Sequence, residues 1–237
     1  MDGVGIPAAP SAPQSGPHAF DASAALHGRP GLMTAFLLVP CAPYGAVGFA
    51  DTERRVLTRL KETHQTEESI RENPLWEAYR SFYAEMNVKP SGVSTPLKQA
   101  LRIMRRDAYR PIHPVVDVCM EIEYSTLCSF QVYDADRIGR SVTYGPADGP
   151  GAEDGMRQVR AGELVLSDEH GIIHSPTCGN GAGRLVGDAS GSALIRVLRI
   201  PGMDADTFSG AVDEAARRLS AADVLVLSAD SPTGKCG

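Results

Sequence analysis

The C-terminal third of the chain carries the pattern that most restricts how the sequence can fold. The apolar run ALIRVLRI is followed by an amphipathic segment from about Asp204 to Leu219, and then by the apolar run ADVLVLS. Short apolar runs of this kind indicate strands, and the segment between them has helical periodicity. The preceding stretch GELVLSDEHGIIHSP predicts a hairpin, because two apolar runs flank the turn residues Asp168 to Gly171. Together these elements predict an α+β fold, with a mixed or antiparallel sheet and flanking helices, rather than a doubly wound parallel sheet.

The N-terminal half adds one strand and three helices. Residues Met33 to Val39 predict a first buried strand. A charged amphipathic pattern predicts a helix from Asp51 to about Ile70. A second helix is predicted to begin at Asn73, which can cap it, and a third begins just before Pro96. The stretch GRSVTYG then predicts a further strand ahead of the hairpin.

We expect one domain, residues 31–228, between two unstructured ends. Residues 1–30 are rich in Pro, Ala, Gly and Ser without a sustained apolar period, which predicts a disordered leader. Residues 229–237 are expected to form a flexible tail. The run GLMTAFLLVP is too short to cross a bilayer, and the segment before it carries almost no positive charge. We therefore expect a cytoplasmic protein without a membrane partner.

The charge balance restricts the classes of partner. A formal net charge of −6 and a pI near 5.5 do not favour a protein that grips nucleic acid over a broad basic surface. The one concentrated basic patch is Arg102, Arg105 and Arg106 on the third predicted helix. A solvated helix face is the ordinary explanation of such a patch. A local contact with RNA phosphates is the alternative, because clustered arginines create positive potential even on an acidic protein.

The cysteines and histidines do not predict a metal centre. Five cysteines are widely spaced with no C-x-x-C pair, which favours reduced thiols over disulfides or structural zinc. His170 and His174 flank the predicted turn and do not share one helical face. We expect neither a metal nor a cofactor.

The glycine-rich stretch CGNGAGRLVGDASGS does not match a standard nucleotide-binding loop. Its first glycines are spaced by two, and Arg184 stands where a dinucleotide fingerprint has its last glycine. Polar residues are instead distributed over two segments, 111–136 and 177–192, without a single evident nucleophile. This distribution suits a pocket for a small amphipathic ligand, or hydrolysis of an activated ester by positioned water.

Several motifs in consistent order resemble a known module. The stretch IHPVVDVCM followed by CSFQVYDADRIG resembles the tRNA-binding and editing module of the phenylalanyl-tRNA synthetase beta subunit, its third and fourth B domains, in the free-standing bacterial form. The stretches NPLWEAYRSFY, KPSGVSTPLKQAL and GELVLSDEHG match further segments of that module. The similarity extends over roughly residues 55 to 200. It implies an α+β module that accepts the aminoacyl end of a tRNA and hydrolyses a wrong aminoacyl ester.

The resemblance assigns catalytic roles to three residues. His113 would be the proton shuttle, and Asp117 would orient it or bind an amino group. Gln131 stands where the synthetase has a histidine; it can orient water but cannot act as a base. Met120 replaces the asparagine that usually follows the Val-Asp pair.

Four further residues would bind the substrate. Tyr133, Asn180, Arg184 and Ser190 fall in the segments that form the pocket in the resemblance, with Asn180 on a water or carbonyl and Arg184 on a carboxylate or phosphate. Each of these residues also has an ordinary structural explanation, because buried polar groups are usually satisfied by neighbours.

Two other functions stay open. The protein could be an accessory or gatekeeper that holds an activated amino-acid derivative for a partner enzyme, for instance in specialised, antibiotic-type metabolism. It could also bind RNA without chemistry, through the arginine patch. The sequence predicts neither the amino acid involved nor an oligomeric state.

Overall fold

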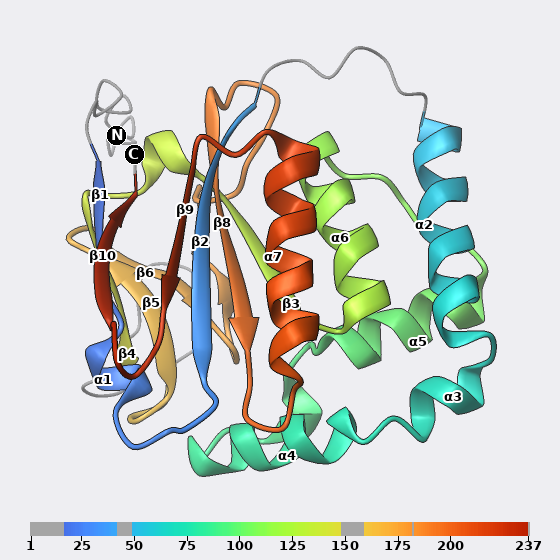
Figure 1. Ribbon diagram of the computed structural model, residues 1–237, viewed down its shortest axis with the longest axis horizontal. Coiled ribbons are helices and arrows are strands. Elements are labelled where there is room, and N and C mark those ends of the chain that lie inside the picture. The colour runs from blue at the N-terminus through green and yellow to red at the C-terminus, as the bar shows by residue number, and fades with distance from the viewer. Residues whose placement is uncertain (1–16, 42–48, 148–158, 182, 237) are drawn as a thin grey trace, which may run out of the picture.

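Two β-sheets and a set of helices make up the chain in the computed structural model, which describes residues 17–41, 49–147, 159–181 and 183–236 (Figure 1). Along the chain the elements are β1 (His18–Asp21), α1 (Ser23–Leu26), β2 (Met33–Pro40), α2 (Phe49–His64), α3 (Glu67–Arg71), α4 (Leu75–Glu85), the 3-10 turn η1 (Pro90–Gly92), α5 (Pro96–Arg106), α6 (Pro114–Thr126), β3 (Ser129–Asp134), the 3-10 turn η2 (Ala135–Arg137), β4 (Ser141–Pro146), β5 (Leu164–Asp168), β6 (Gly171–Ser175), β7 (Gly179–Asn180), β8 (Ser192–Arg199), α7 (Ala205–Leu219), β9 (Asp223–Leu227) and β10 (Thr233–Cys236).

A four-stranded antiparallel sheet has the strand order β3-β8-β2-β9. Its central strands β8 and β2 pair along their whole length, and most of their residues are buried on both faces. Burial on both faces explains why MTAFLLVP and SALIRVLR have continuous apolar runs instead of alternating polar residues. β3 and β9 form the two edges of this sheet.

A six-stranded mixed sheet has the order β10-β1-β4-β5-β6-β7. β1 and β4 run parallel, whereas the other neighbouring strands are antiparallel. The predicted hairpin is β5 and β6, and Asp168 pairs with Gly171 at its turn. The prediction of an α+β fold with mixed or antiparallel pairing and flanking helices is confirmed, with the strands divided between two sheets.

The prediction of a disordered leader over residues 1–30 is wrong for residues 17–30, and residues 1–16 lie outside the described part. β1 pairs in parallel with β4, and α1 follows it. The physical reason is Phe20, whose buried ring stacks on Phe36 of β2 with 4.1 Å between the ring centroids. This aromatic pair joins the two sheets.

The expected flexible tail, residues 229–237, is also corrected by the structure. Residues 233–236 form β10, which pairs with β1 so that Thr233 faces Asp21. Gly234 allows this strand to approach β9, because a Cβ at that position would lie 2.5 Å from Leu225 Cδ1. The first and the last described strands, β1 and β10, are therefore neighbours in the six-stranded sheet, with β10 as its edge strand.

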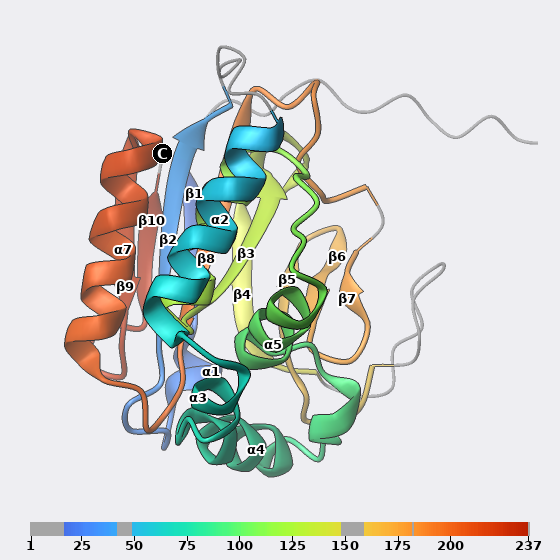
Figure 2. The same ribbon diagram turned by 90° about the vertical axis from the view of Figure 1, so that its right-hand side faces the viewer.

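The elements form three layers. In Figure 1 the six-stranded sheet lies on one face of the four-stranded sheet, and α2, α6 and α7 lie on the other. The helices α3, α4 and α5 cross one end of this assembly, as Figure 2 shows from the side. Buried side chains from both sheets and from the helices form one hydrophobic cluster.

The single helix predicted from Asp51 to about Ile70 is two helices. α2 ends at His64, and Gln65 adopts a left-handed backbone conformation with φ 53°. Thr66 then caps α3 by accepting a hydrogen bond from the N–H of Ser69. The break lets α3 turn and pack against α5.

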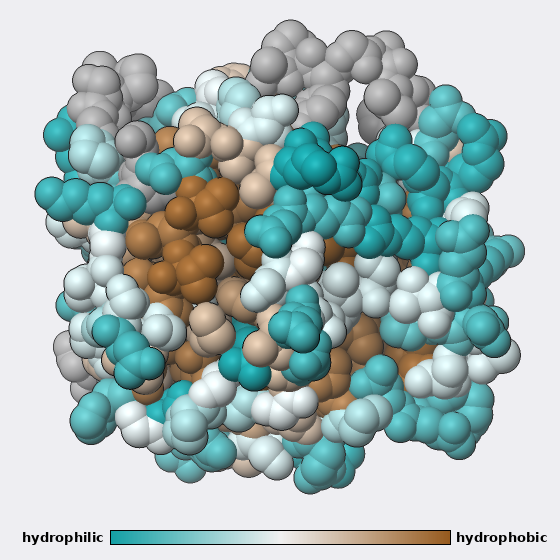
Figure 3. Space-filling view, viewed as in Figure 1, coloured by the Kyte–Doolittle hydropathy of each residue, from teal (hydrophilic) through white to brown (hydrophobic). Residues whose placement is uncertain are grey.

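An apolar surface patch lies at the β9 edge of the four-stranded sheet, opposite the β3 edge. Figure 3 shows it as a brown area over β9 and β2. Val224 and Val226 are each 41% exposed there.

In the described part of the chain, no helix is both long enough and apolar enough to cross a membrane.

Candidate functional site

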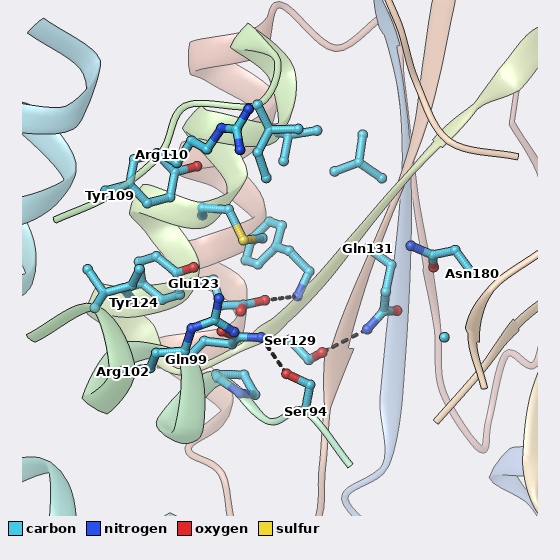
Figure 4. A pocket seen from close by; sticks show the side chains of 18 of the residues that line it. Ser94, Gln99, Arg102, Tyr109, Arg110, Glu123, Tyr124, Ser129, Gln131 and Asn180 are labelled. Atoms are coloured by element: carbon cyan, nitrogen blue, oxygen red, sulfur yellow. Dashed lines mark hydrogen bonds between the residues drawn. The ribbon is translucent and has the colours of Figure 1, made fainter. Parts of the chain in front are cut away.

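A cavity of about 1000 Å³ lies at the β3 edge of the four-stranded sheet. Its walls come mainly from α5, the loop from α5 to α6, α6, β3 and the β6–β7 region, with Glu53 of α2, Tyr83 of α4 and residues 185–186 completing them. Figure 4 shows side chains of α5 and α6 on one side and Gln131 and Asn180 on the other. β3 pairs with β8 along one edge, and among the described residues its other edge has a single bridge, between Tyr133 and Leu185, so the rest of that edge borders the cavity.

Part of the cavity wall is apolar and aromatic. Val116 and Met120 contribute from α6, and Phe130 and Val132 from β3, with the ring of Tyr124 beside them. These side chains come from a helix and an adjacent strand that the short turn after Thr126 holds together. They can bury an apolar ligand group of the size of an amino-acid side chain.

Exposed arginines line the same cavity. Arg102 and Arg106 of α5 and Arg110 of the following loop are in its wall. Within the described residues, none of these three forms an ion pair with a carboxylate. Arg105 differs, because its Nε donates to Glu67 at 2.8 Å and its side chain does not line the cavity. Of the predicted arginine patch, Arg102 and Arg106 therefore line the cavity, whereas Arg105 forms an ion pair at the surface.

Asp117 holds the loop that precedes α6. Its Oδ1 accepts hydrogen bonds from the Tyr109 hydroxyl at 2.7 Å and from the Ile112 N–H at 2.9 Å. Asp117 is buried and is not part of the cavity wall. Its contact with the cavity is indirect, because the loop that it fixes carries Arg110.

Two other buried carboxyl groups of α6 have contrasting surroundings. Glu121 is bound by Arg218 at 2.8 Å and Arg55 at 3.1 Å, in an ion-pair cluster with neighbouring helices. Glu123 instead receives one hydrogen bond within the described residues, from the Phe130 N–H at 2.7 Å. Glu123 lines the cavity, and Glu121 does not.

Burial dominates the protonation of Glu123. The residue is 5% exposed, and within the described chain no lysine or arginine lies within ion-pair distance of it. Burial raises the pKa of the Glu123 carboxyl to about 8, and the Phe130 N–H lowers it only in part. The group is therefore mainly protonated at neutral pH when the cavity is empty.

Gln131 is held at both ends of its carboxamide. Its Nε2 donates to Ser129 Oγ at 2.7 Å, and its Oε1 accepts from Arg196 Nη1 at 3.3 Å. Arg196 is 2% exposed, and its guanidinium carbon lies 3.7 Å from the centroid of the Tyr144 ring. Gln131 and Ser129 both line the cavity. The second N–H of Gln131 and the Ser129 hydroxyl can donate to a ligand carbonyl.

His174 is the imidazole of the cavity wall. Its Nδ1 lies 2.8 Å from Asn180 Oδ1, so Nδ1 carries the proton and Nε2 has a free lone pair. Burial lowers the pKa of His174 to about 4, against the effect of the Asn180 hydrogen bond. The ring is therefore neutral at pH 7, and Nε2 can accept a hydrogen bond from water.

Two other predicted site residues, His113 and Tyr133, do not line the cavity. His113 caps α6, because its Nδ1 accepts from the Val115 N–H at 3.3 Å. Tyr133 is fully buried, and its hydroxyl has no hydrogen-bond partner among the described residues. Its backbone forms a bridge with Leu185.

Arg184 and Ser190 also lie outside the wall. Arg184 forms two hydrogen bonds with the buried carboxylate of Asp168, at 2.8 and 3.1 Å. Ser190 donates to Asp134 Oδ2 at 2.8 Å. The structure thus brings Gln131, Asn180, Arg102 and Arg106 into the cavity and keeps the other predicted residues outside its wall.

Glu123, Ser129 and His174 were not identified from the sequence as residues of the site, although all three line the cavity. A signal for Glu123 was present: PVVDVCMEIEYST is apolar on nearly every side, which indicates a buried helix whose acidic residues need partners. Among the described residues, no group of three or more His, Cys, Asp or Glu side chains is placed to hold a metal ion.

No protein-family model and no curated protein matches the sequence. Among solved structures, the chain is similar to an N-terminal fragment of the phenylalanyl-tRNA synthetase beta subunit from Pyrococcus horikoshii, with 14% identity and a TM-score of 0.35. The match covers 45% of this chain and 39% of that chain. At this level of similarity the site has to be interpreted from its own residues.

Proposed function

We propose that the cavity binds an aminoacyl group, carried on the end of a tRNA or on another activated ester, and that it promotes hydrolysis of that ester. The observation that carries the proposal is the combination, in one cavity, of an apolar wall and three arginines without carboxylate partners among the described residues. An aminoacyl-tRNA end joins the same two features, an amino-acid side chain and phosphates.

The wall offers a place for each part of such a ligand. Met120, Phe130 and Val132 would bury the amino-acid side chain. Arg102 and Arg106 would bind phosphate oxygens at the exposed end of the cavity. The carbonyl would lie between these regions, within reach of donors on β3.

Hydrolysis would depend on oriented water. Gln131 and Ser129 supply N–H and O–H donors for the carbonyl oxygen, whose negative charge increases as water attacks. We assign the orientation of the water to Nε2 of His174, because His174 lines the cavity, whereas His113 caps α6 and does not line the cavity. Because its pKa is lowered to about 4, His174 is a weak base, so the proposal is restricted to activated esters.

A panel of mischarged tRNAs tests this function. We expect the protein to release the amino acid from at least one member, and His174→Ala to slow that release by about tenfold to a hundredfold. His113→Ala is the matched control and should leave the rate within about twofold. No release from any member, or an equal loss in both variants, would rule out the hydrolytic assignment.

The arginines can be tested by the salt dependence of tRNA binding. Replacing Arg102 or Arg106 with Ala should reduce the slope of log Kd against log salt by about 0.7 to 0.9 for each phosphate that the variant no longer binds. Arg105→Ala should leave the slope unchanged, because Arg105 is paired with Glu67. Identical slopes in all three variants would contradict the assignment of these arginines to phosphate.

A second candidate is an accessory protein that holds an activated amino-acid derivative for a partner enzyme. It is favoured by the low basicity of His174 and by the absence, among the residues described in the cavity wall, of a nucleophile paired with a base. The two functions change the lifetime of an aminoacyl ester in opposite directions. A hydrolase shortens it, whereas a holder that excludes water prolongs it.

A further inference from the structure

Glu123 is the one carboxyl group of α6 that lines the cavity. Asp117 and Glu121 have partners that explain their burial, namely two hydrogen bonds and an ion-pair cluster. Among the described residues Glu123 has the single bond from Phe130, although a carboxylate can accept about four. A buried carboxyl group without a cation partner has unused capacity on the side that faces the cavity.

None of the described groups around Glu123 supplies a positive charge that could pair with its carboxylate. Tyr79 and Tyr83 of α4 face it, as do Tyr109 of the loop before α6, Tyr124 beside it on α6, and the thiols of Cys119 and Cys128. All of these groups are neutral at pH 7, because the ordinary pKa of a phenol or a thiol lies above 7 and burial raises it further. The arginines of the cavity lie beyond ion-pair distance.

We propose that Glu123 is the receptor for a ligand ammonium group, so that the cavity selects primary amines over neutral molecules of the same shape. This inference rests on the function proposed above and specifies which part of the ligand is recognised. An ammonium group beside Glu123 would form the ion pair that the empty cavity lacks, and the aromatic rings of Tyr83 and Tyr124 would flank the cation.

The ion pair has a proton balance that can be measured. At pH 6.5 Glu123 is protonated in the empty cavity, and an α-amino group is mainly an ammonium ion. Forming carboxylate and ammonium in the complex breaks the O–H bond of Glu123 and transfers that proton to buffer. Binding of an amine should release about one proton per site, and binding of a neutral analogue should release none.

Isothermal titration calorimetry in buffers of different ionisation enthalpy measures this release. The probes are L-phenylalaninamide with 3-phenylpropanamide, and L-leucinamide with 4-methylpentanamide; each second member lacks only the amine. We expect the amine to bind about tenfold to a hundredfold more tightly in at least one pair. In Glu123→Gln we expect both the preference and the proton release to be lost, while the neutral analogue still binds.

A second carboxyl group of the wall provides the control. Glu53 of α2 lines the cavity and accepts a hydrogen bond from the Tyr109 N–H at 3.2 Å. Glu53→Gln should keep the proton release. Proton release that persists in Glu123→Gln, or that disappears in Glu53→Gln instead, would overturn the assignment.

The outcomes separate this inference from the proposed function. If Glu123→Gln hydrolyses or binds aminoacyl-tRNA as well as the unmodified protein does, the aminoacyl function stands and the ammonium receptor is refuted. If no amine, neutral analogue or aminoacyl-tRNA binds, both are refuted.

Discussion

Replacing Glu123 with Gln should change how the stability of the protein depends on pH. Burial raises the pKa of Glu123 from its ordinary value near 4.5 to about 8 in the folded protein. Between these values the folded protein holds one more proton than the unfolded chain. The free energy of unfolding therefore falls as pH rises through this interval, and the stability that protonated Glu123 provides is lost as pH passes about 8.

The size of the effect follows from the pKa difference. Each pH unit between about 5 and 8 should remove about 1.4 kcal/mol from the free energy of unfolding, and the whole interval roughly 4 kcal/mol. Glutamine does not titrate, and its Oε1 can still accept the hydrogen bond from the Phe130 N–H. The variant should therefore lose this part of the pH dependence while keeping the local structure.

Urea unfolding of both proteins at a series of pH values from about 5 to 9 measures the difference. Other titrating groups cancel in the comparison. The free energy of unfolding of Glu123→Gln minus that of the unmodified protein should increase by roughly 4 kcal/mol as the pH rises from about 5 to 9. A difference between the two proteins that stays constant with pH would refute the reasoning.

Glu121 provides an internal control, because its contribution to the free energy of unfolding should change with pH in the opposite direction to that of Glu123. Burial alone would raise the pKa of Glu121, but the hydrogen bonds and charges of Arg218 and Arg55 hold it below its ordinary value. Its ion pairs therefore contribute stability above the unfolded pKa, and this contribution is lost as pH falls through the folded pKa. Glu121→Gln should be less stable than the unmodified protein at neutral pH, with the difference shrinking in acid.

Three further substitutions test local contacts by urea unfolding. Arg184→Ala removes the cation partner of the buried Asp168 carboxylate, which keeps its hydrogen bonds from the Gly139 and His170 N–H groups, and should lower the free energy of unfolding by about 3 to 5 kcal/mol; a loss below about 1 kcal/mol would contradict this role. Thr95→Ala removes the cap of α5 and should lower it by about 1 kcal/mol, whereas Thr95→Ser should have little effect. Tyr109→Phe removes a hydrogen bond to Asp117 and should lower it by about 1 to 2 kcal/mol, so an unchanged value would argue against that hydrogen bond.

Local sequence signals identified the elements whose partners are near in the chain. The β5–β6 hairpin was predictable because its turn residues lie between two apolar runs, and α7 because its periodicity extends over several turns. β1 and β10 were missed because each has four residues and they pair from opposite ends of the sequence. Such pairing depends on tertiary contacts such as Phe20 with Phe36.

The candidate site could be predicted only in part, for a related reason. Gln131 and Asn180 were identified from the segments that carry them, and both line the cavity. Polarity alone could not separate them from Asp117 or Arg184, whose hydrogen bonds are made to the loop before α6 and to the β5–β6 turn. Glu123 was missed because only the fold shows which acid of α6 lacks a cation among the described residues.

The central claim is that the cavity between α5, α6 and β3 binds an aminoacyl group. The most direct measurement is the affinity of the protein for a panel of 3′-aminoacylamino-adenosines, in which an amide replaces the labile ester. The same affinities are measured for Met120→Trp, in which the larger side chain would occupy the space beside the apolar wall. The account predicts that at least one compound binds and that Met120→Trp weakens this binding by about tenfold or more. Absence of binding across the panel, or equal binding by the folded variant, would contradict it.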